Sequence, residues 1–356
     1  MIIKSFIRKI IERRKIKALK KSVINLKHDK FECGKARDID YRNKGFSLTE
    51  STLYNFPKND YRKYITTWEA YQPRIKNSQY SFLSDNKYLF SIVFGKYIRT
   101  AKVFALIRNG NVISTDNYDL SNENLYEFIF QNGGAVIKDT FGSDGFDVFV
   151  LRVKKDKLIY KDEDIDKNKL KKIVAKFKDA IIQEVIEQGT FENKIFPNSV
   201  NTVRVISMRK KGSDEHEIVA ALQRIGNNRC APVDNFNQGG GCALIDIHTG
   251  KLGKMTSAFS VDEAGNRKFY DVHPDTGAVI NGTSIPNWNK LPSIIAYVTK
   301  MIPYFEYIAW DIVVQNEGFA LIEINLKSSL NVFQIHGGMR DSFLGQKYRE
   351  HGYLVE

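Results

Sequence analysis

Two polar residues share one face of an apolar segment near the end of the chain. In GFALIEINLKSS, Glu323 and Asn325 are separated by one residue and flanked by side chains that suit a buried core. The preceding segment, YIAWDIVVQNEG, predicts a hairpin whose three-residue loop ends with Gly318 in the left-handed conformation. This register places Asp311 opposite Glu323, and the alternation of side chains along a strand puts Asn325 on the same face.

Three oxygen-bearing side chains on one face predict a site for a divalent metal ion. Oxygen ligands without thiolates or imidazoles favour Mg²⁺ or Mn²⁺ over zinc. The alternative is the polar outer face of an ordinary hairpin. Because the neighbours Trp310 and Ile312 are apolar and an isolated buried carboxylate is costly, we prefer the metal site, with Asp311, Glu323 and Asn325 as its ligands.

A glycine-containing loop suggests a place for phosphate groups. In AVIKDTFGSDGFDVFVL, Lys138 lies on a predicted strand, and Gly142, Ser143 and Gly145 follow in the loop. Such a loop lets backbone N–H groups approach phosphate oxygens, and the lysine adds a compact positive charge. The order differs from a Walker A loop, in which the lysine follows the glycines and opens a helix. A simple turn between two strands is the alternative.

Two more predicted strands carry polar residues at or near their ends. AIIQEVIEQ reaches Gln183 and Glu184 after an apolar run, and backbone groups there can contact an adenine ring; a plain buried strand is the alternative. NSVNTVRVIS places Arg204 near a strand start as a candidate phosphate ligand, although an arginine in a strand is more often a surface charge.

The elements that must position these residues mix helices with mainly antiparallel strands. A mainly helical region with polar connections is predicted before residue 85. Beyond it, KVFALIRNGNVIS predicts a hairpin around Asn109-Gly110, KNKLKKIVAKFKDA and LPSIIAYVTKMIP predict helices, and most other apolar runs predict strands. This mixture indicates an α+β fold.

Composition limits the class of protein without choosing its partner. The 356 residues carry a formal charge of +13, which suits nucleic acid, an anionic membrane or small anions; because no nucleic-acid motif accompanies it, we expect no nucleic-acid partner. Cys33, Cys230 and Cys242 form no disulfide framework or metal-binding pattern, which favours a reducing cytoplasm. No apolar run reaches the roughly 18 residues of a membrane span.

The N-terminal residues predict a basic amphipathic helix. In MIIKSFIRKIIERRKIKALKK, residues 1–21, apolar positions fall near helical spacing among lysines and arginines. Such a helix can lie on the inner face of an anionic membrane. A structural helix packed on its own domain, with a solvated basic face, is the alternative. The segment lacks the continuous apolar stretch of a secretory signal.

The order of these features resembles the ATP-grasp superfamily over roughly Asp85 to Gly345. PNSVNTVRV, GGGCALIDIHTGKL, HPDTGAVINGTSIPNW and YIAWDIVVQNEGFALIEIN look like its sugar-transfer-associated branch, whose members tend to be associated with bacterial capsule and exopolysaccharide assembly. The resemblance implies ATP held between two α+β subdomains. We expect a helical basic region at 1–84, a first subdomain with the lid loop at 85–183 and a second with the metal site at 184–356.

The resemblance also implies roles for individual residues. Lys87 and Lys138 resemble the two ATP lysines, and Gly142 to Gly145 resemble the flexible lid over the phosphates. Arg204 would steady the transferred phosphate above Mg²⁺. The adenine-binding linker and the more loosely aligned ribose contact then fall at Gln183, Glu184, Val185, Ile186 and Glu192.

The activity implied by the resemblance is carboxylate–amine ligation. A carboxylate attacks the γ-phosphate of ATP, ADP leaves, and an amine converts the acyl phosphate into an amide. We expect the substrates to be a hexuronic acid and an amino acid or simple amine, or an acyl group and an amino sugar, in surface polysaccharide synthesis. The alternatives are a peptide ligase of a secondary-metabolite pathway and a nucleotide-binding partner of glycosyltransferases that does not turn over.

Polar residues outside the ATP motifs are candidates for the substrate side. QIHGGMRDS follows the metal strand, and DVHPDTG predicts a substrate loop, with a plain turn as its alternative. A structural loop histidine is the alternative in QIHGG. The candidates are Asn201, His273, Gln334, His336 and Arg340.

Overall fold

The computed structural model describes residues 14–24, 39–56, 58–115, 118–142, 147–263, 266–326 and 328–354. The chain divides into two compact units. Unit 1 comprises Met1–Lys76, Val261–Lys268 and Lys327–Glu356, and unit 2 comprises Asn77–Ser260 and Phe269–Leu326. Ser143, Gly145 and residues 1–13 of the predicted N-terminal helix lie outside the described residues.

Unit 2 contains a seven-stranded sheet in which neighbouring strands run antiparallel. Its strands are β1 (Val103–Arg108), β2 (Asn111–Ser114), β3 (Gly134–Asp139), β4 (Phe149–Lys154), β5 (Lys157–Tyr160), β6 (Glu163–Asp164) and β7 (Asp179–Gln183). The order β2-β1-β7-β3-β4-β5-β6 places β7 between β1 and β3. This inner position explains why DAIIQ is apolar and buried after its first residue.

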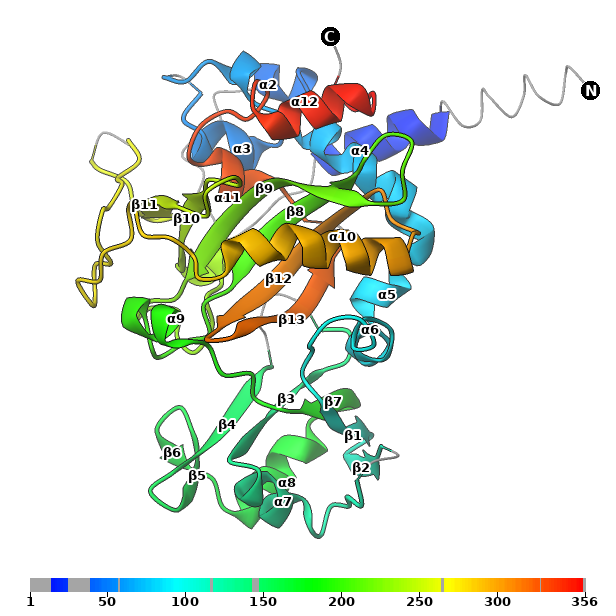
Figure 1. Cartoon of the computed structure of the whole chain (residues 1–356), viewed down its shortest axis with the longest axis vertical. Helices are drawn as coiled ribbons and strands as arrows, with labels where there is room; N and C mark the ends of the chain where they lie inside the picture. The colour runs from blue at the N-terminus through cyan, green and yellow to red at the C-terminus, as the bar shows by residue number, and fades with distance from the viewer. Residues whose placement is uncertain are drawn as a thin grey trace, which may run out of the picture. The chain divides into compact units, whose positions relative to one another are not determined.

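Unit 2 also contains a six-stranded antiparallel sheet (Figure 1). Its strands are β8 (Val203–Arg209), β9 (His216–Ile225), β10 (Gly241–Ile245), β11 (Leu252–Ser257), β12 (Tyr307–Gln315) and β13 (Gly318–Asn325). The order is β11-β10-β9-β8-β12-β13, so β12 joins the edge hairpin to the rest of the sheet. Every residue of β12 before Gln315 is buried, which matches its apolar sequence.

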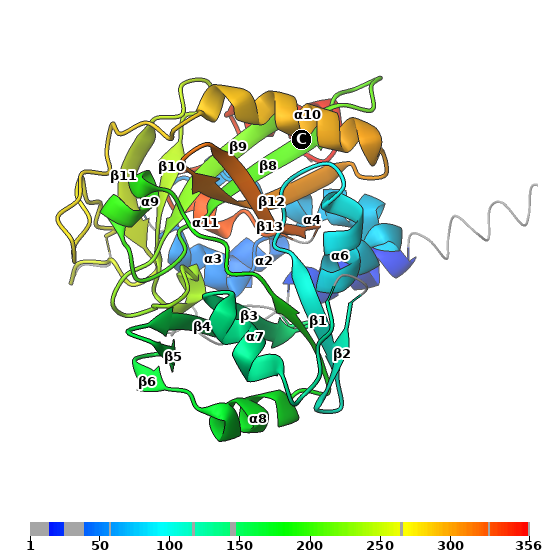
Figure 2. The same cartoon turned by 60° about the horizontal axis from the view of Figure 1, so that its bottom comes forward.

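Helices cover both sheets of unit 2. α10 (Leu291–Met301) crosses one face of the six-stranded sheet and buries Ile295 and Val298 in its core (Figure 1). α7 (Leu125–Gln131) and α8 (Lys167–Ala175) bury their apolar faces in the core of the seven-stranded sheet (Figure 2). The remaining α-helices described in this unit are α5 (Phe82–Asp85), α6 (Lys87–Phe94) and α9 (Thr190–Ile195).

The predicted α+β class is confirmed, and so is the hairpin at Asn109-Gly110. Arg108 pairs with Asn111, and both loop residues have positive φ angles of 50° and 77°, as a tight hairpin turn requires.

The loop predicted between β12 and β13 is wrong in its length, although the predicted register is correct. Gln315 pairs with Gly318, so the turn has two residues, and Gly318 is not left-handed. A bulge between Asp311 and Ile312 adds the missing residue on β13. Asp311 therefore pairs with Glu323 as predicted.

Unit 1 is mainly helical. Residues 14–24 are helical, and the other helices are α2 (Ile39–Asn43), α3 (Leu48–Leu53), most of α4 (Thr67–Asn77), α11 (Asn331–Gln334) and α12 (Phe343–Glu350). Ser47 and Glu50 form a capping box that fixes the start of α3. The C-terminal helices α11 and α12 thus belong with the N-terminal helices, a grouping that the boundaries predicted at residues 84 and 184 did not anticipate. No helix among the described residues is long and apolar enough to cross a membrane.

Candidate functional site

Asp311 is the buried centre of an ion-pair network on the six-stranded sheet. It lies opposite Arg204 of β8, and 2% of its surface is exposed. Arg204 Nε donates to Asp311 Oδ1 at 2.7 Å, and Arg204 Nη2 donates to Asp311 Oδ2 at 2.5 Å. A guanidinium recognises carboxylate and phosphate groups with this two-point geometry. Arg204 is therefore an inward-facing group and not the surface charge of the alternative interpretation.

A second arginine, which the sequence analysis missed, completes the network. Arg224 of β9 donates from Nη1 to Asp311 Oδ2 at 3.1 Å and pairs through Nη2 with Asp234 Oδ1 at 2.8 Å. Asp234 also accepts hydrogen bonds from the backbone N–H and the hydroxyl of Thr202, at 2.8 and 2.5 Å. The available signal was an arginine late in the apolar strand HEIVAALQRIG, which pairs with the strand of Arg204.

Burial and charge act in opposite directions on the two members of the central pair. Burial alone would lower the pKa of Arg204, but the Asp311 carboxylate raises it above its ordinary value. Burial would likewise raise the pKa of Asp311, but Arg204 and Arg224 hold it below its ordinary value. Glu323 differs, because burial and then the Asp311 charge raise its pKa against the opposing effect of Lys138. Asp311 is therefore the carboxyl group that ionises more readily.

Two lysines bring positive charge to the same carboxylate. Lys138 lies on β3 with 8% of its surface exposed, and burial lowers its pKa to about 8, while the charge of Glu323 opposes that decrease. Lys87 begins α6, where the Asn86 side chain caps the helix. Burial also lowers the pKa of Lys87, and Glu323 is the largest opposing charge. The structure thus brings Lys87 and Lys138 together around Glu323.

The oxygen donors fit a hard divalent cation. Asn325 follows Glu323 on the same face of β13, across from the strand of Asp311. Among the described residues there is no group of three His, Cys, Asp or Glu side chains suited to a metal ion, so a cation here depends on the amide oxygen of Asn325 as a third protein ligand. The raised pKa of Glu323 beside Asp311 marks two carboxylates that repel each other, and a divalent cation would relieve that repulsion.

The start of the predicted lid is tied to Lys87. The backbone N–H of Lys87 donates to the Thr140 carbonyl at 3.0 Å, and its ammonium group donates to the Gly142 carbonyl. The loop therefore leaves β3 beside a predicted ATP lysine. Its continuation through Ser143 and Gly145 lies outside the described residues.

The predicted adenine linker adjoins the strands that carry the predicted metal ligands. Beyond Gln183, the last residue of β7, Ile186 packs in a small apolar cluster with Val313 of β12 and Ala320 of β13. The Glu184 carboxylate is tied down at the strand end, where it accepts hydrogen bonds from Arg99 at 2.6 Å and from the Lys102 backbone at 3.1 Å. An apolar cluster beside a charged site suits the flat ring of a base.

The carboxyl group predicted to contact ribose is sequestered. Glu192 has no exposed surface, and burial raises its pKa, with a further increase from Asp234. Gln223 donates to Glu192 Oε2 at 3.2 Å, while Glu192 Oε1 has no hydrogen-bond partner among the described residues. In this conformation the group is part of the scaffold and does not line an open ribose site.

Two predicted substrate residues, Asn201 and His273, also have their polar groups engaged inside the scaffold. Asn201 Nδ2 donates to the Phe196 carbonyl at 2.9 Å, and its Oδ1 accepts from the Gly226 backbone at 2.9 Å. His273 Nε2 lies 2.9 Å from the Gly226 carbonyl, and its Nδ1 accepts from the Asp275 backbone at 3.1 Å. These contacts hold loops in place, so the structure gives both side chains a structural use.

The other three predicted substrate residues, Gln334, His336 and Arg340, belong to unit 1. The Gln334 side chain accepts a hydrogen bond from the backbone N–H of Ile65 at 2.7 Å and donates one to the backbone carbonyl of Ile65 at 2.8 Å. Arg340 Nη1 donates to both oxygens of Glu69 at 2.9 Å. Burial, and then the charge of Arg267, lowers the pKa of His336 to about 4, so its ring is neutral near pH 7.

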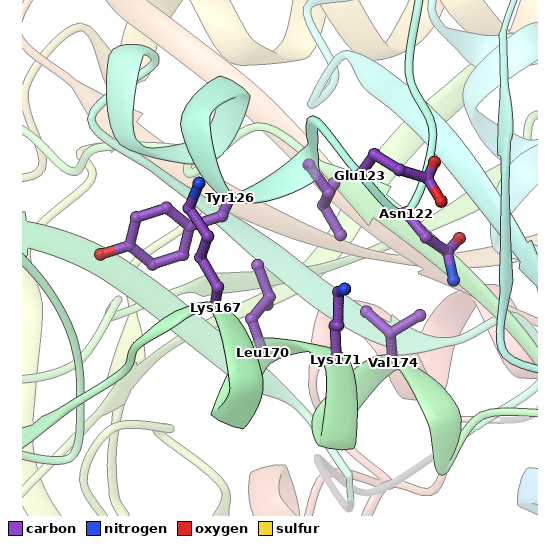
Figure 3. A pocket seen from close by; sticks show the side chains of 8 residues that line it. Asn122, Glu123, Tyr126, Lys167, Leu170, Lys171 and Val174 are labelled. Carbon is purple, nitrogen blue, oxygen red and sulfur yellow. The ribbon is translucent and has the colours of Figure 1, made fainter.

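A small cavity between α7 and α8 is separate from these residues. Its volume is about 50 Å³, and Figure 3 shows Lys167, Lys171 and Tyr126 at its rim. That volume admits a few water molecules and no nucleotide.

Several solved structures are similar to this chain at low sequence identity. The structure of the ligase PsnB with the precursor peptide PsnA2 and AMPPNP is 11% identical, with a TM-score of 0.40, and the match covers 77% of this chain and 60% of that one. The biotin carboxylase domain of Hydrogenobacter thermophilus 2-oxoglutarate carboxylase is 10% identical, with a TM-score of 0.37, and the match covers 71% of this chain and 42% of that one. The N5-carboxyaminoimidazole synthetase from Staphylococcus aureus is 8% identical, with a TM-score of 0.35, and the match covers 69% of this chain and 45% of that one. The match therefore spans 60% or less of the length of each of these proteins.

No curated protein matches the sequence. The sequence model described as sugar-transfer associated ATP-grasp matches residues 67–342, well over half of the 356 residues. The chain belongs to the sugar-transfer associated ATP-grasp family.

Proposed function

We propose that this chain is an ATP-dependent carboxylate–amine ligase that forms an acyl phosphate and releases ADP. The observation that carries the proposal is the convergence of Arg204 and Lys138 on the neighbouring carboxylates Asp311 and Glu323. Phosphoryl transfer depends mainly on positioning and on neutralising charge, and these groups supply both signs of charge in a largely buried place.

In the first proposed step, a carboxylate oxygen of the acceptor bonds to the γ-phosphorus of ATP and the bond to the β,γ-bridging oxygen breaks, which releases ADP. Lys138 and Arg204 face the phosphate oxygens on which charge accumulates, and Arg224 reinforces Arg204 from the next strand. Mg²⁺, held by Asp311, Glu323 and Asn325, would neutralise further phosphate charge. In the second step the amine nitrogen bonds to the acyl carbon, phosphate leaves, and the nitrogen loses a proton.

Water must be kept from the acyl phosphate for this sequence to be productive. The loop that begins at Gly142 is our candidate for the lid, because its described start is already bound to Lys87. The apolar cluster around Ile186 is our candidate for the adenine pocket.

We further propose that the reaction serves the assembly of a bacterial surface polysaccharide. It would join an amino acid or simple amine to the carboxylate of a hexuronic acid, or an acyl group to an amino sugar. The sugar-transfer description of the family supports this choice. A peptide ligase of a secondary-metabolite pathway would share the phosphate chemistry and differ only in the acceptor.

Isotope transfer tests the proposed reaction directly. The chain is incubated with MgATP, an amine and a uronic acid labelled with ¹⁸O in its carboxylate. Acyl phosphate formation moves one labelled oxygen into inorganic phosphate, and hydroxylamine in place of the amine yields a hydroxamate. Release of AMP and pyrophosphate would overturn the proposal. A protein that binds ATP but forms no ADP with uronic acids, amino acids or acyl donors for amino sugars would support the non-catalytic alternative.

The predicted contact of residues 1–21 with a cytoplasmic membrane surface remains a proposal. Its support is the set of exposed basic residues in the described part, which includes Arg14, Lys15 and Lys17. Deleting residues 1–21 should reduce sedimentation with anionic vesicles. Undiminished sedimentation would mean that this segment is not the anchor.

A further inference from the structure

Unit 1 contains a cavity of about 380 Å³, which is within the size range of small-molecule binding sites. All the residues that line it belong to this unit. Most of them precede residue 67, where the match to the family begins. The cavity is therefore largely a feature of segments outside the matched region, and the nucleotide-site residues described above do not line it.

The lining of the cavity carries an excess of positive charge. Four basic residues face one acidic residue, which leaves an excess of three positive charges; the basic residues are Lys20, Lys44, Arg62 and Arg340, and the acidic residue is Glu69. A hollow with one sign of charge and low-dielectric walls concentrates ions of the opposite sign. The charge pattern therefore favours an anionic ligand.

Two of the cations are placed by aromatic rings. Lys44 Nζ lies over the ring of Tyr61 at 4.1 Å from its centroid, and Lys20 Nζ lies over the ring of Trp68 at 5.9 Å. Both distances are within the range of cation–π attraction. The ring contacts place both ammonium groups at the wall of the cavity.

The guanidinium groups are held differently. Arg340 is fixed by two hydrogen bonds of 2.9 Å to Glu69, which is 2% exposed and also accepts from the Thr66 backbone at 2.9 Å. Arg62 pairs with Asp60, which does not line the cavity. The buried carboxylate of Glu69 fixes the position of Arg340 before a ligand arrives, whereas the side chains of Arg62 and Asp60 are 75% and 36% exposed.

The rest of the lining suits a ligand with hydroxyl groups and an apolar ring face. Aromatic rings, the Asn43 amide and the Thr66 hydroxyl line the cavity together with the cations. Rings of this kind combine an apolar face with a polar tip, and amides and hydroxyls both donate and accept hydrogen bonds. We propose that this cavity binds a sugar of about monosaccharide size that carries a phosphate or a carboxylate group.

Binding is tested by calorimetry on the full chain in the absence of ATP, so the result does not depend on the proposed ligase activity. The probes are glucose 1-phosphate, glucuronate, glucose and inorganic phosphate. We expect at least one of the two anionic sugars to bind, and the tighter one identifies the anion. Binding of inorganic phosphate as tight as that of glucose 1-phosphate, or binding of neither anionic sugar, would overturn the proposal.

Matched variants locate the site. The double variant Lys20→Gln/Lys44→Gln should weaken binding by about tenfold or more, because charged hydrogen bonds are lost. The control Lys21→Gln/Lys63→Gln removes the same charge from neighbouring exposed positions that do not line the cavity, and it should bind like the wild type. Equal weakening in both variants would mean that only the overall charge matters.

A measurement on the wild type guards against a variant that fails to fold. Lysines are acetylated with and without the bound sugar, and the modified sites are mapped by mass spectrometry. Lys20 and Lys44 should be protected at least threefold relative to Lys21 and Lys63. Binding without that protection would place the ligand elsewhere and overturn the assignment.

Discussion

Arg204 and Asp311 face each other across β8 and β12 and form two hydrogen bonds of 2.7 and 2.5 Å. Both carboxylate oxygens of Asp311 are thus bound by the arginine that we propose to hold the transferred phosphate. A divalent cation at Asp311 and a phosphate at Arg204 would each compete with this pair. Metal and nucleotide binding should therefore be coupled, because each frees one partner for the other.

Variants of Arg204 and Asp311 should show that each side chain depends on the other for its contribution to stability. Arg204→Ala and Asp311→Ala each leave a buried charge without its main partner, and each should lower the free energy of unfolding by about 3 kcal/mol. The double variant should lose much less than the sum of the two, because neither charge remains. Urea unfolding of the four proteins measures this. Additive losses would mean that the two side chains stabilise the fold independently.

Glu323→Gln should separate function from stability. The folded-state pKa of Glu323 is raised, so its contribution to stability is present below its unfolded pKa of about 4.5 and is lost as the pH rises. At pH 7 the amide should leave the melting temperature unchanged or higher. Mg²⁺-dependent ADP formation should fall by at least about a hundredfold, because a charged metal ligand is gone. Full activity in this variant would show that the metal site is misassigned.

Nucleotide binding should weaken at high pH because Lys138 loses its charge. Its pKa in the ligand-free protein is about 8, so the ammonium charge is lost as the pH rises through that value. The affinity for a non-hydrolysable ATP analogue should fall above pH 8. Lys138→Arg keeps its positive charge over this range, so its affinity should not fall above pH 8. An identical profile in the variant would assign the titration to another group.

The lowered pKa of Lys138 should make stability change with pH in the opposite direction to nucleotide affinity. The unfolded state binds more protons than the folded state between pH 8 and the ordinary lysine value of 10.5, so the contribution of Lys138 to stability increases over this range. Wild-type unfolding free energies, relative to those of Lys138→Met, should show that increase.

Asp234 should act as a positioning residue for Arg224. Asp234→Asn keeps the shape of the side chain but weakens its bonds to Arg224 and Thr202, so the KM for ATP should rise several-fold. Asp214→Asn is the matched control, since Asp214 pairs with Arg209 at the exposed end of β8. A similar change in both variants would point to a general charge effect.

Local sequence patterns predicted the part of the site that lies within one hairpin. Asp311 and Glu323 lie on consecutive strands of one hairpin, so alternation along the two strands sufficed to pair them. Arg224 could not be predicted in the same way, because its role depends on β9 lying beside β8 and on an ion pair with Asp234 in the connection that follows β9. Contacts of that kind follow from the order of strands in the sheet.

Several residues predicted to contact substrate also have a structural use that the sequence did not indicate. Asn201, His273 and Gln334 are polar residues near predicted ligand motifs, yet their hydrogen bonds hold backbone segments in place. Buried backbone groups need partners, and polar side chains in loops often supply them. Sequence alone does not separate that use from binding. The grouping of α11 and α12 with the N-terminal helices was hidden for a related reason, since it depends on contacts such as that of Gln334 with Ile65.

The bulge beside Asp311 divides the edge hairpin into two registers. Between the turn and the bulge, the pairs run from Gln315 with Gly318 to Ile312 with Leu321. Beyond the bulge, from the pair of Asp311 with Glu323 onward, β13 is shifted by one residue. Removing Ile322, the unpaired bulge residue, would merge the two registers and leave Glu323 opposite Asp311 and Asn325 opposite Ala309. One residue of β13 can therefore be lost at the bulge without changing these pairs, whereas loss of Ile324 would move Asn325 to the opposite face of the strand, where Leu326 now packs.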